Sequence, residues 1–122
     1  MVRIKRAYEE ATRSDGYRVL VDRLWPRGVK KEALKLDSWA KELAPSSTLR
    51  RWFGHEPERF REFARRYAAE LRAGPARALL ADLTRRAELG TVTLVYGARD
   101  EEHNGAVVLR DAIVGALEDR AT

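Results

Sequence analysis

The sequence contains no cysteine among its 122 residues. Disulfide bonds, thiolate nucleophiles and cysteine-based zinc sites are therefore excluded, so any nucleophile must be oxygen, imidazole or water. Histidine is nearly as scarce, because His55 and His103 are the only two. These histidines could join Asp22 and Asp100 around a divalent metal ion, but no closely spaced pair of ligands supports such a site. We expect neither a metal nor another cofactor.

Long apolar runs are also missing from the sequence. No stretch approaches the ~20 apolar residues that a membrane-spanning helix needs. Met1–Lys5 leads directly into strand-like alternation and lacks the apolar segment of a signal peptide. We therefore expect a cytoplasmic protein without a membrane partner. With 122 residues, of which 44% are hydrophobic, the chain can close one core. We expect a single domain over residues 1–122, and its oligomeric state stays open.

Basic residues outnumber acidic ones, with 24 Lys and Arg against 19 Asp and Glu, and the formal net charge is +5. A positive chain favours acidic partners such as nucleic acid, nucleotides or phosphorylated metabolites. The acidic residues are interspersed among the basic ones, which is typical of a solvated face. We find no helix-turn-helix or RNA-reading motif. Arginines nevertheless recur on two of the expected helices, at Arg61, Arg65, Arg66, Arg85 and Arg86.

Three segments have the character of strands, namely residues 1–8, 17–22 and 91–96. Residues 1–8 alternate apolar with basic side chains, which predicts a strand with one face in solvent. Residues 17–22 are apolar enough to be covered on both faces. Residues 38–43 fit a short strand or a turn.

Helices are expected at four places in the chain. A short helix should follow Pro45, and a longer one should run from Pro57 to Gly74. The next helix should begin at Gly74 and end near Gly90, and Asn104 can cap the last one. Strands and helices in this order predict an α/β domain with a small, mostly parallel sheet flanked by helices.

Polar clusters follow two of the expected strands. Asp22, Arg23 and Arg27 come directly after the second strand, and residues 97–103 follow the third. Open α/β sheets bind ligands beyond the carboxyl ends of their strands. The two clusters should therefore meet if these strands are parallel neighbours.

The residue types in and around the two clusters suit an anion site. Guanidinium groups recognise phosphate or carboxylate in a bidentate manner, and the backbone N–H groups that begin the last helix can add to such a site. The candidate ligand-binding residues are Arg23, Trp25, Arg27, Trp52, His55, Tyr96, Arg99 and Asn104. The candidate catalytic residues are Asp22, Asp100 and His103, since Asp100 could orient His103 as a general acid or base. Two simpler interpretations stay open: Asp22 can pair with Arg23 or Arg99 to close the strand end, and His103 can cap a helix.

Four separated segments of the chain resemble one bacterial family. They are Val21–Gly28, Leu43–Ser46, Leu49–His55 and Leu94–Ala106. In this order the segments resemble the YeaO-like branch of a large bacterial family of unknown function, and the likeness spans nearly the whole chain. The resemblance implies a compact cytoplasmic α/β domain with no established activity. Relatives in the wider family carry cysteines where this chain has residues 96–104, so a thiol mechanism does not apply here.

The leading hypothesis is a site at the strand ends for an anionic small molecule, such as a phosphate or a nucleotide-like ligand, with catalysis not established. The alternative is a nucleic-acid-binding module that uses the arginine-rich surface. A third interpretation is a protein-interaction domain in which the polar clusters are structural ion-pair networks.

Overall fold

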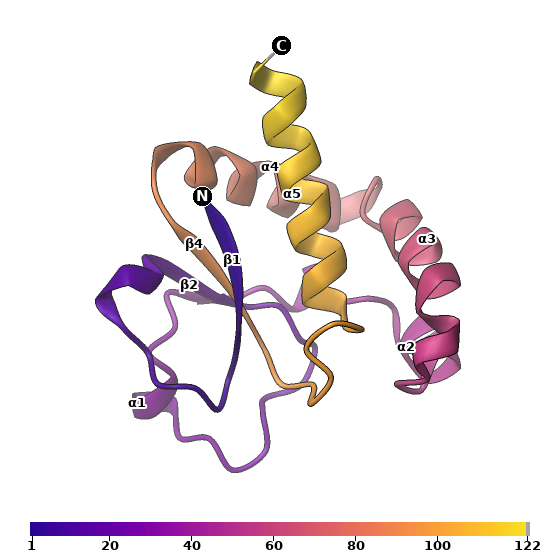
Figure 1. The fold of residues 1–122 in the computed structure, drawn as a ribbon, viewed down its shortest axis with the longest axis horizontal. Coiled ribbons are helices and arrows are strands. Elements are labelled where there is room, and N and C mark those ends of the chain that lie inside the picture. Colours follow the sequence, from indigo (N-terminus) through magenta and orange to yellow (C-terminus); the bar gives the residue numbers. More distant parts are fainter. Residues whose placement is uncertain (122) are drawn as a thin grey trace.

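A four-stranded parallel sheet forms the centre of the protein (Figure 1). The computed structural model describes residues 1–121. The strands are β1 (Val2–Arg6), β2 (Tyr17–Leu20), β3 (Ser38–Trp39) and β4 (Val92–Tyr96). Their order in the sheet is β1-β4-β2-β3, so β4 lies between β1 and β2 and is buried along its whole length. The parallel pairing confirms the predicted sheet type.

The helices lie around this sheet. They are α1 (Lys31–Leu34), α2 (Ser47–Phe53), α3 (Phe60–Glu70), α4 (Gly74–Leu89) and α5 (Gly105–Ala121). Helices α4 and α5 contact the sheet, and α3 packs against α5 and carries α2 at its side (Figure 1). The predicted α/β class with flanking helices is therefore confirmed. No helix within residues 1–121 is both long enough and apolar enough to cross a lipid bilayer.

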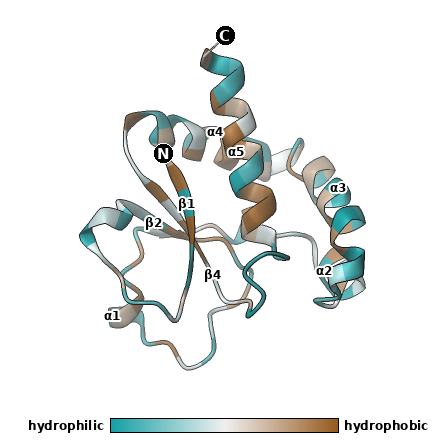
Figure 2. Cartoon of the chain, in the orientation of Figure 1, coloured by the Kyte–Doolittle hydropathy of each residue, from teal (hydrophilic) through white to brown (hydrophobic). Residues whose placement is uncertain are grey.

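Side chains alternate along the strands and build two apolar clusters, one on each face of the sheet. Leu94 and Val19 are register partners and belong to the main core, which the longer helices cover. Val95 and Leu20 belong to a smaller cluster, where Leu34 of α1 packs against them. Figure 2 shows hydrophobic residues along the strands and on α5, and hydrophilic residues over α2 and α3.

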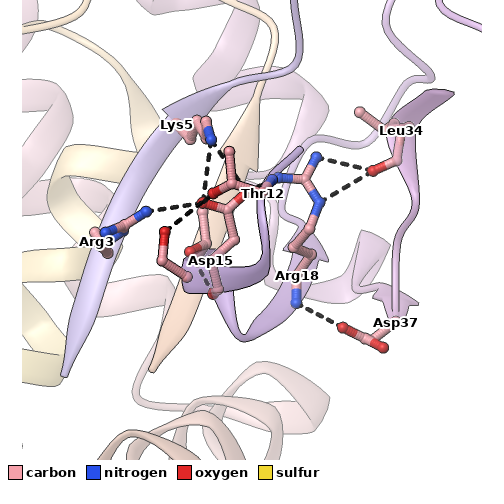
Figure 3. Close-up of polar contacts among 9 residues, drawn as sticks. Arg3, Lys5, Thr12, Asp15, Arg18, Leu34 and Asp37 are labelled. Carbon is pink, nitrogen blue, oxygen red and sulfur yellow. Dashed lines mark hydrogen bonds and ion pairs between the residues drawn. The ribbon is translucent and has the colours of Figure 1, made fainter. Parts of the chain in front are cut away.

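A buried carboxylate holds the segment before β2 against the sheet (Figure 3). Asp15 is fully buried and accepts hydrogen bonds from Arg3 Nη2 at 2.8 Å, Arg18 Nη1 at 2.7 Å and Lys5 Nζ at 3.1 Å. The backbone N–H and the hydroxyl group of Thr12 donate to it as well. Burial raises the pKa of the Asp15 carboxyl, but these hydrogen bonds outweigh burial and hold the pKa well below its ordinary value.

This cluster corrects the expectation that one face of β1 lies in solvent. Arg3 and Lys5 point to the face on which Asp15 is buried, and both are only partly exposed. The expectation failed because a strand pattern of alternating apolar and basic residues does not reveal a distant carboxylate. Here Asp15 reaches that face because the Thr93 hydroxyl group of β4 donates to its carbonyl at 2.6 Å.

A second network fixes α2, the helix that contributes to the site. The Ser46 hydroxyl group caps α2 by accepting the Leu49 N–H at 3.2 Å, and it donates to Glu70 Oε2 at 2.7 Å. The Ser46 N–H donates to Glu70 Oε1 at 2.8 Å. Tyr67, which is buried in α3, donates to the Leu43 carbonyl. These bonds tie the beginning of α2 to α3.

Candidate functional site

The loops that follow β2 and β4 lie side by side and border one pocket. The Gly97 N–H donates to Asp22 Oδ2 at 2.8 Å, and the Val21 N–H donates to the Val95 carbonyl at 3.1 Å. A cavity of about 280 Å³ opens between these loops, α2 and the beginning of α5, and we name it the strand-end pocket. Its lining consists of Tyr8, Val21, Asp22, Arg23, Leu24, Trp25, Pro26, Arg27, Ala44, Pro45, Arg50, Phe53, His55, Tyr96, Gly97, Ala98, Asn104 and Gly105.

Two tryptophans hold the loop after β2 in place. The Trp39 indole N–H donates to the Asp22 carbonyl at 2.7 Å, and the Trp25 indole N–H donates to the Val29 carbonyl at 2.7 Å. The two indole rings meet edge to face, with their centres 5.4 Å apart. Both indoles thus combine apolar packing with a satisfied N–H donor, which orders the backbone that carries the polar side chains of the pocket.

Asp22 supplies the carboxylate of the pocket lining. Its Oδ2 accepts the Gly97 N–H, and we find no further hydrogen bond to this carboxylate within residues 1–121. Oδ1 therefore has no donor within these residues, and Asp22 lies in the lining of the pocket. Burial raises the pKa of the Asp22 carboxyl, while the Gly97 N–H and the nearby side chains of His55 and Arg50 act in the opposite direction.

Three arginines of the lining have no acidic partner. Within residues 1–121, the guanidinium groups of Arg23, Arg27 and Arg50 make no ion pair. The Nε of Arg23 is also buried without a hydrogen-bond partner in the same part of the chain. A buried donor without an acceptor costs free energy. Arg23 is half-buried, and Arg27 and Arg50 are exposed. The exposed Arg66 of α3, by contrast, pairs with Glu62 at 2.8 Å.

His55 reaches the pocket from the turn that ends α2. Gly54 ends the helix with a left-handed φ of 55°, and His55 follows with a φ of 58°. Left-handed backbone is uncommon for a residue other than glycine. This turn places His55 in the lining near Phe53, with the two ring centres 6.1 Å apart.

Tyr96 and Asn104 close the pocket at the beginning of α5. Asn104 Oδ1 accepts the Val107 N–H at 3.0 Å and so caps α5, as the sequence predicts. Its Nδ2 donates to the Asp100 carbonyl at 2.8 Å. Burial raises the pKa of the Tyr96 phenol above its ordinary value. Gly105, the first residue of α5, lies in the lining, so this helix begins beside the pocket.

The sequence matches the family model of one protein family over residues 1–122, and this family is described as the inactive DUF488-N3 subclade. The chain belongs to this family. Among its relatives, the uncharacterised protein YeaO of Escherichia coli K12 is 45% identical over 111 residues, which cover 90% of this chain and 94% of YeaO. The uncharacterised protein Rv3073c of Mycobacterium tuberculosis H37Rv is 45% identical over 114 residues, which cover 93% of this chain and 94% of the relative. These findings confirm the YeaO-like resemblance. No solved structure matches the chain.

The strand-end pocket of this DUF488-N3 protein brings together part of the candidate set. The candidates in its lining are Asp22, Arg23, Trp25, Arg27, His55, Tyr96 and Asn104. The candidates outside its lining are Trp52, Arg99, Asp100 and His103.

Asp100 and His103 bond to each other beside the pocket. Asp100 Oδ1 accepts the N–H groups of Glu102 at 2.9 Å and His103 at 3.1 Å, and Oδ2 lies 2.9 Å from His103 Nδ1. These contacts lower the pKa of the Asp100 carboxyl, and the hydrogen bond from the Glu102 N–H has the largest effect. The imidazole also packs edge-on against Phe60, with ring centres 5.2 Å apart. The pair therefore closes the turn before α5. Within residues 1–121 no group of three or more metal-ligating side chains is arranged around a common point.

Trp52 lies on another side of α2 from the pocket. Its ring is covered by the guanidinium groups of Arg66, 4.4 Å from the ring centre, and Arg59, 5.5 Å from it. Arg99 is exposed on the loop after β4. Nearness in sequence suggested that both residues border the pocket, but consecutive residues of a helix or loop point in different directions.

Arg50 and Phe53 are pocket residues that the sequence analysis did not select. They are three residues apart on α2, and this spacing places them on one face of the helix. The sequence did contain a signal for these two residues, because both lie in the segment Leu49–His55 that resembles the family. Helical spacing applied to that segment would have grouped Arg50 with Phe53 and separated Trp52 from them.

Proposed function

We propose that this member of the DUF488-N3 subclade binds a small phosphate-bearing anion in the strand-end pocket. The arginines without acidic partners carry this proposal. Arg23, Arg27 and Arg50 line one cavity, and none of them forms an ion pair within the described chain. Guanidinium groups suit the bidentate binding of phosphate, and the backbone N–H groups that begin α5 favour the same charge.

We propose that the protein binds this anion without converting it, because the family is described as an inactive subclade. Asp100 and His103, which have the residue types of an acid–base pair, lie outside the lining and bond to each other. Asp22 is the candidate catalytic residue that lies in the lining. We assign it a role in orienting the ligand.

Isothermal titration calorimetry on the full chain, with inorganic phosphate and a set of phosphate monoesters, tests the proposal. A hydrogen bond to a charged group contributes about 1.5–3 kcal/mol. Arg23→Ala should therefore weaken binding of the best monoester about tenfold or more. Arg99→Ala is the matched control, because Arg99 is exposed and lies outside the lining.

The control should leave the dissociation constant within about twofold, since salt screens an exposed charge. Equal losses in Arg23→Ala and Arg99→Ala would indicate general attraction to a positive surface and contradict a specific site. Absence of binding for inorganic phosphate and every monoester would overturn the proposal.

Nucleic-acid binding is the second candidate, and the net charge of +5 favours it. Much of the arginine-rich surface is neutralised locally, however. Arg65 and Arg66 share Glu62, and two arginines of α4 share Asp82 in the same way. Filter binding with duplex DNA and single-stranded RNA at ~50 mM salt tests this candidate, because phosphate contacts are least screened there. Undetectable binding would exclude it.

A further inference from the structure

The lining of the strand-end pocket contains a carboxylate oxygen without a hydrogen-bond donor, and a simple anion does not supply one. Asp22 lies in the lining of the pocket, and its Oδ1 has no donor within residues 1–121. The Asp22 carboxylate accepts one hydrogen bond, from the Gly97 N–H. The amide oxygen of an asparagine at this position could accept that bond equally well, so the bond alone does not explain a carboxylate. A carboxylate on the wall also repels an anionic ligand. Its presence is explained if the ligand itself brings a hydrogen-bond donor to Oδ1.

The charge of the lining restricts the kind of donor. The three guanidinium groups of Arg23, Arg27 and Arg50, set against the carboxylate of Asp22, leave two positive charges when His55 is neutral. A phosphate monoester carries about −1.5 to −2 charges at pH 7 and so balances this lining. The balance holds only if the donor group of the ligand is neutral, as a hydroxyl group is. An ammonium group would leave positive charge uncompensated.

The volume and the apolar walls of the pocket limit the size of the part of the ligand that carries the phosphate and the hydroxyl group. A cavity of about 280 Å³ is at or below the small end of the range of roughly 300–1,000 Å³ for drug-sized ligands. Phe53, Trp25 and Pro45 give it apolar walls against which a short carbon skeleton can pack.

We infer that the strand-end pocket binds a small phosphorylated sugar or polyol. Its phosphate accepts hydrogen bonds from Arg23 and the neighbouring arginines, and a hydroxyl group of its carbon skeleton donates to Asp22 Oδ1. This inference rests on the proposed function and adds hydroxyl recognition to phosphate binding.

Calorimetry with three matched probes tests the inference on the full chain. Ribose 5-phosphate carries the phosphate and the hydroxyl groups, ethyl phosphate has the same charge without them, and phosphoethanolamine has an ammonium group instead. Ribose 5-phosphate should bind about tenfold or more tightly than ethyl phosphate, since a hydroxyl–carboxylate bond is charge-assisted. Phosphoethanolamine should not exceed ribose 5-phosphate. If it binds more tightly, the donor is cationic and the inference is wrong.

The Asp22→Asn variant separates hydroxyl recognition from phosphate binding. Its amide oxygen can accept the Gly97 N–H, which turns the NH₂ group, a donor, toward the pocket. Ribose 5-phosphate should lose about tenfold in affinity. Ethyl phosphate should bind as well as before or more tightly, because a negative charge has left the wall, and its binding also reports that the variant is folded.

The possible results distinguish the inference from the function on which it rests. Equal binding of ribose 5-phosphate and ethyl phosphate by the unmodified chain, or equal losses of both in Asp22→Asn, would overturn hydroxyl recognition and leave phosphate binding standing. Failure of all phosphate probes would overturn both. Adenosine monophosphate serves as a further arm. Weaker binding than ribose 5-phosphate supports a free sugar phosphate, and tighter binding supports the same phosphorylated sugar within a nucleotide.

Discussion

The Asp15→Asn substitution should remove a large part of the stability of this domain. It takes the negative charge away from Arg18, which is only 4% exposed and whose guanidinium group otherwise donates to the neutral Leu34 carbonyl. Breaking a buried ion pair by removing one partner costs ~3–5 kcal/mol, because the other charge stays buried without compensation. Arg3 and Lys5 retain 36% and 13% side-chain exposure and can turn to water, so Arg18 determines the cost.

The expected change in Tm follows from the length of the chain. An unfolding entropy of about 2.1 cal/mol/K per residue, applied to 122 residues, converts 1 kcal/mol into about 4 °C. Asp15→Asn should therefore lower Tm by roughly 12–20 °C. Asp82→Asn is the matched control, because Asp82 also binds two arginines, Arg85 and Arg86, but its side chain is 42% exposed. Exposed ion pairs of this spacing on a helix contribute about 0.3–0.5 kcal/mol each, so the loss of both should lower the Tm of the control by about 4 °C or less.

Thermal unfolding followed by circular dichroism at pH 7 measures both variants, and comparable losses would refute the special role of Asp15. The pH dependence gives an independent check. The pKa of Asp15 is lower in the folded protein than its ordinary value of 3.8, so its contribution is complete above that value and is lost as the pH falls through the folded pKa. The stability difference between the unmodified chain and Asp15→Asn should be constant from pH 7 to about pH 5 and should shrink below about pH 4. A difference that persists undiminished in acid would contradict this account.

Three further predictions follow from single contacts. Gly16→Ala should lower Tm by several degrees, because φ is +63° and an added Cβ would lie 2.3 Å from the Thr91 carbonyl oxygen; Gly90→Ala, with open space around it, should change Tm little. Tyr67→Phe should cost about 1–2 kcal/mol in urea denaturation, since a buried backbone carbonyl loses its donor, and an unchanged midpoint would contradict that bond. Asp22→Asn should raise Tm slightly at pH 7, because burial raises the pKa of this carboxyl and its ionised form therefore opposes folding. That gain should disappear as the pH falls below the ordinary pKa of 3.8, and a lowered Tm at pH 7 would contradict it.

Helices whose ends are marked by glycine, proline or a capping residue were predictable from the sequence. Helix α4 begins with Gly74 and Pro75 and ends at Gly90, and α5 follows its cap Asn104. Helix α1 was not predicted, because its four residues carry little periodicity. It depends on tertiary contacts instead: Leu34 is buried, and its carbonyl accepts two hydrogen bonds from Arg18.

The candidate site was predictable to the extent that it follows from strand order. Two polar loops after parallel neighbouring strands must lie at one edge of the sheet, and β2 and β4 are such neighbours. The choice of individual side chains was less accurate, because it depends on which face of a helix or turn each residue occupies. Asp15 escaped notice for a related reason: it lies in a turn, and its burial arises only when residues from three strands converge on it.

Asp15 and Asp22 lie at opposite ends of β2, and their surroundings differ in a way that bears on function. The Asp15 carboxylate is saturated by cations and N–H groups, which lower its pKa, so it has no capacity left for a ligand. Asp22 accepts one backbone N–H, and burial raises its pKa. Asp22 joins the two strand-end loops through the Gly97 N–H, but the ion pair with Arg23 or Arg99 that the simpler interpretation expected does not form within residues 1–121. A fold that saturates one carboxylate and leaves another with a single hydrogen bond beside unpaired arginines keeps polar groups available for a ligand. Such an arrangement is best explained by a partner outside the chain that brings an anion to the arginines and a hydrogen-bond donor to Asp22.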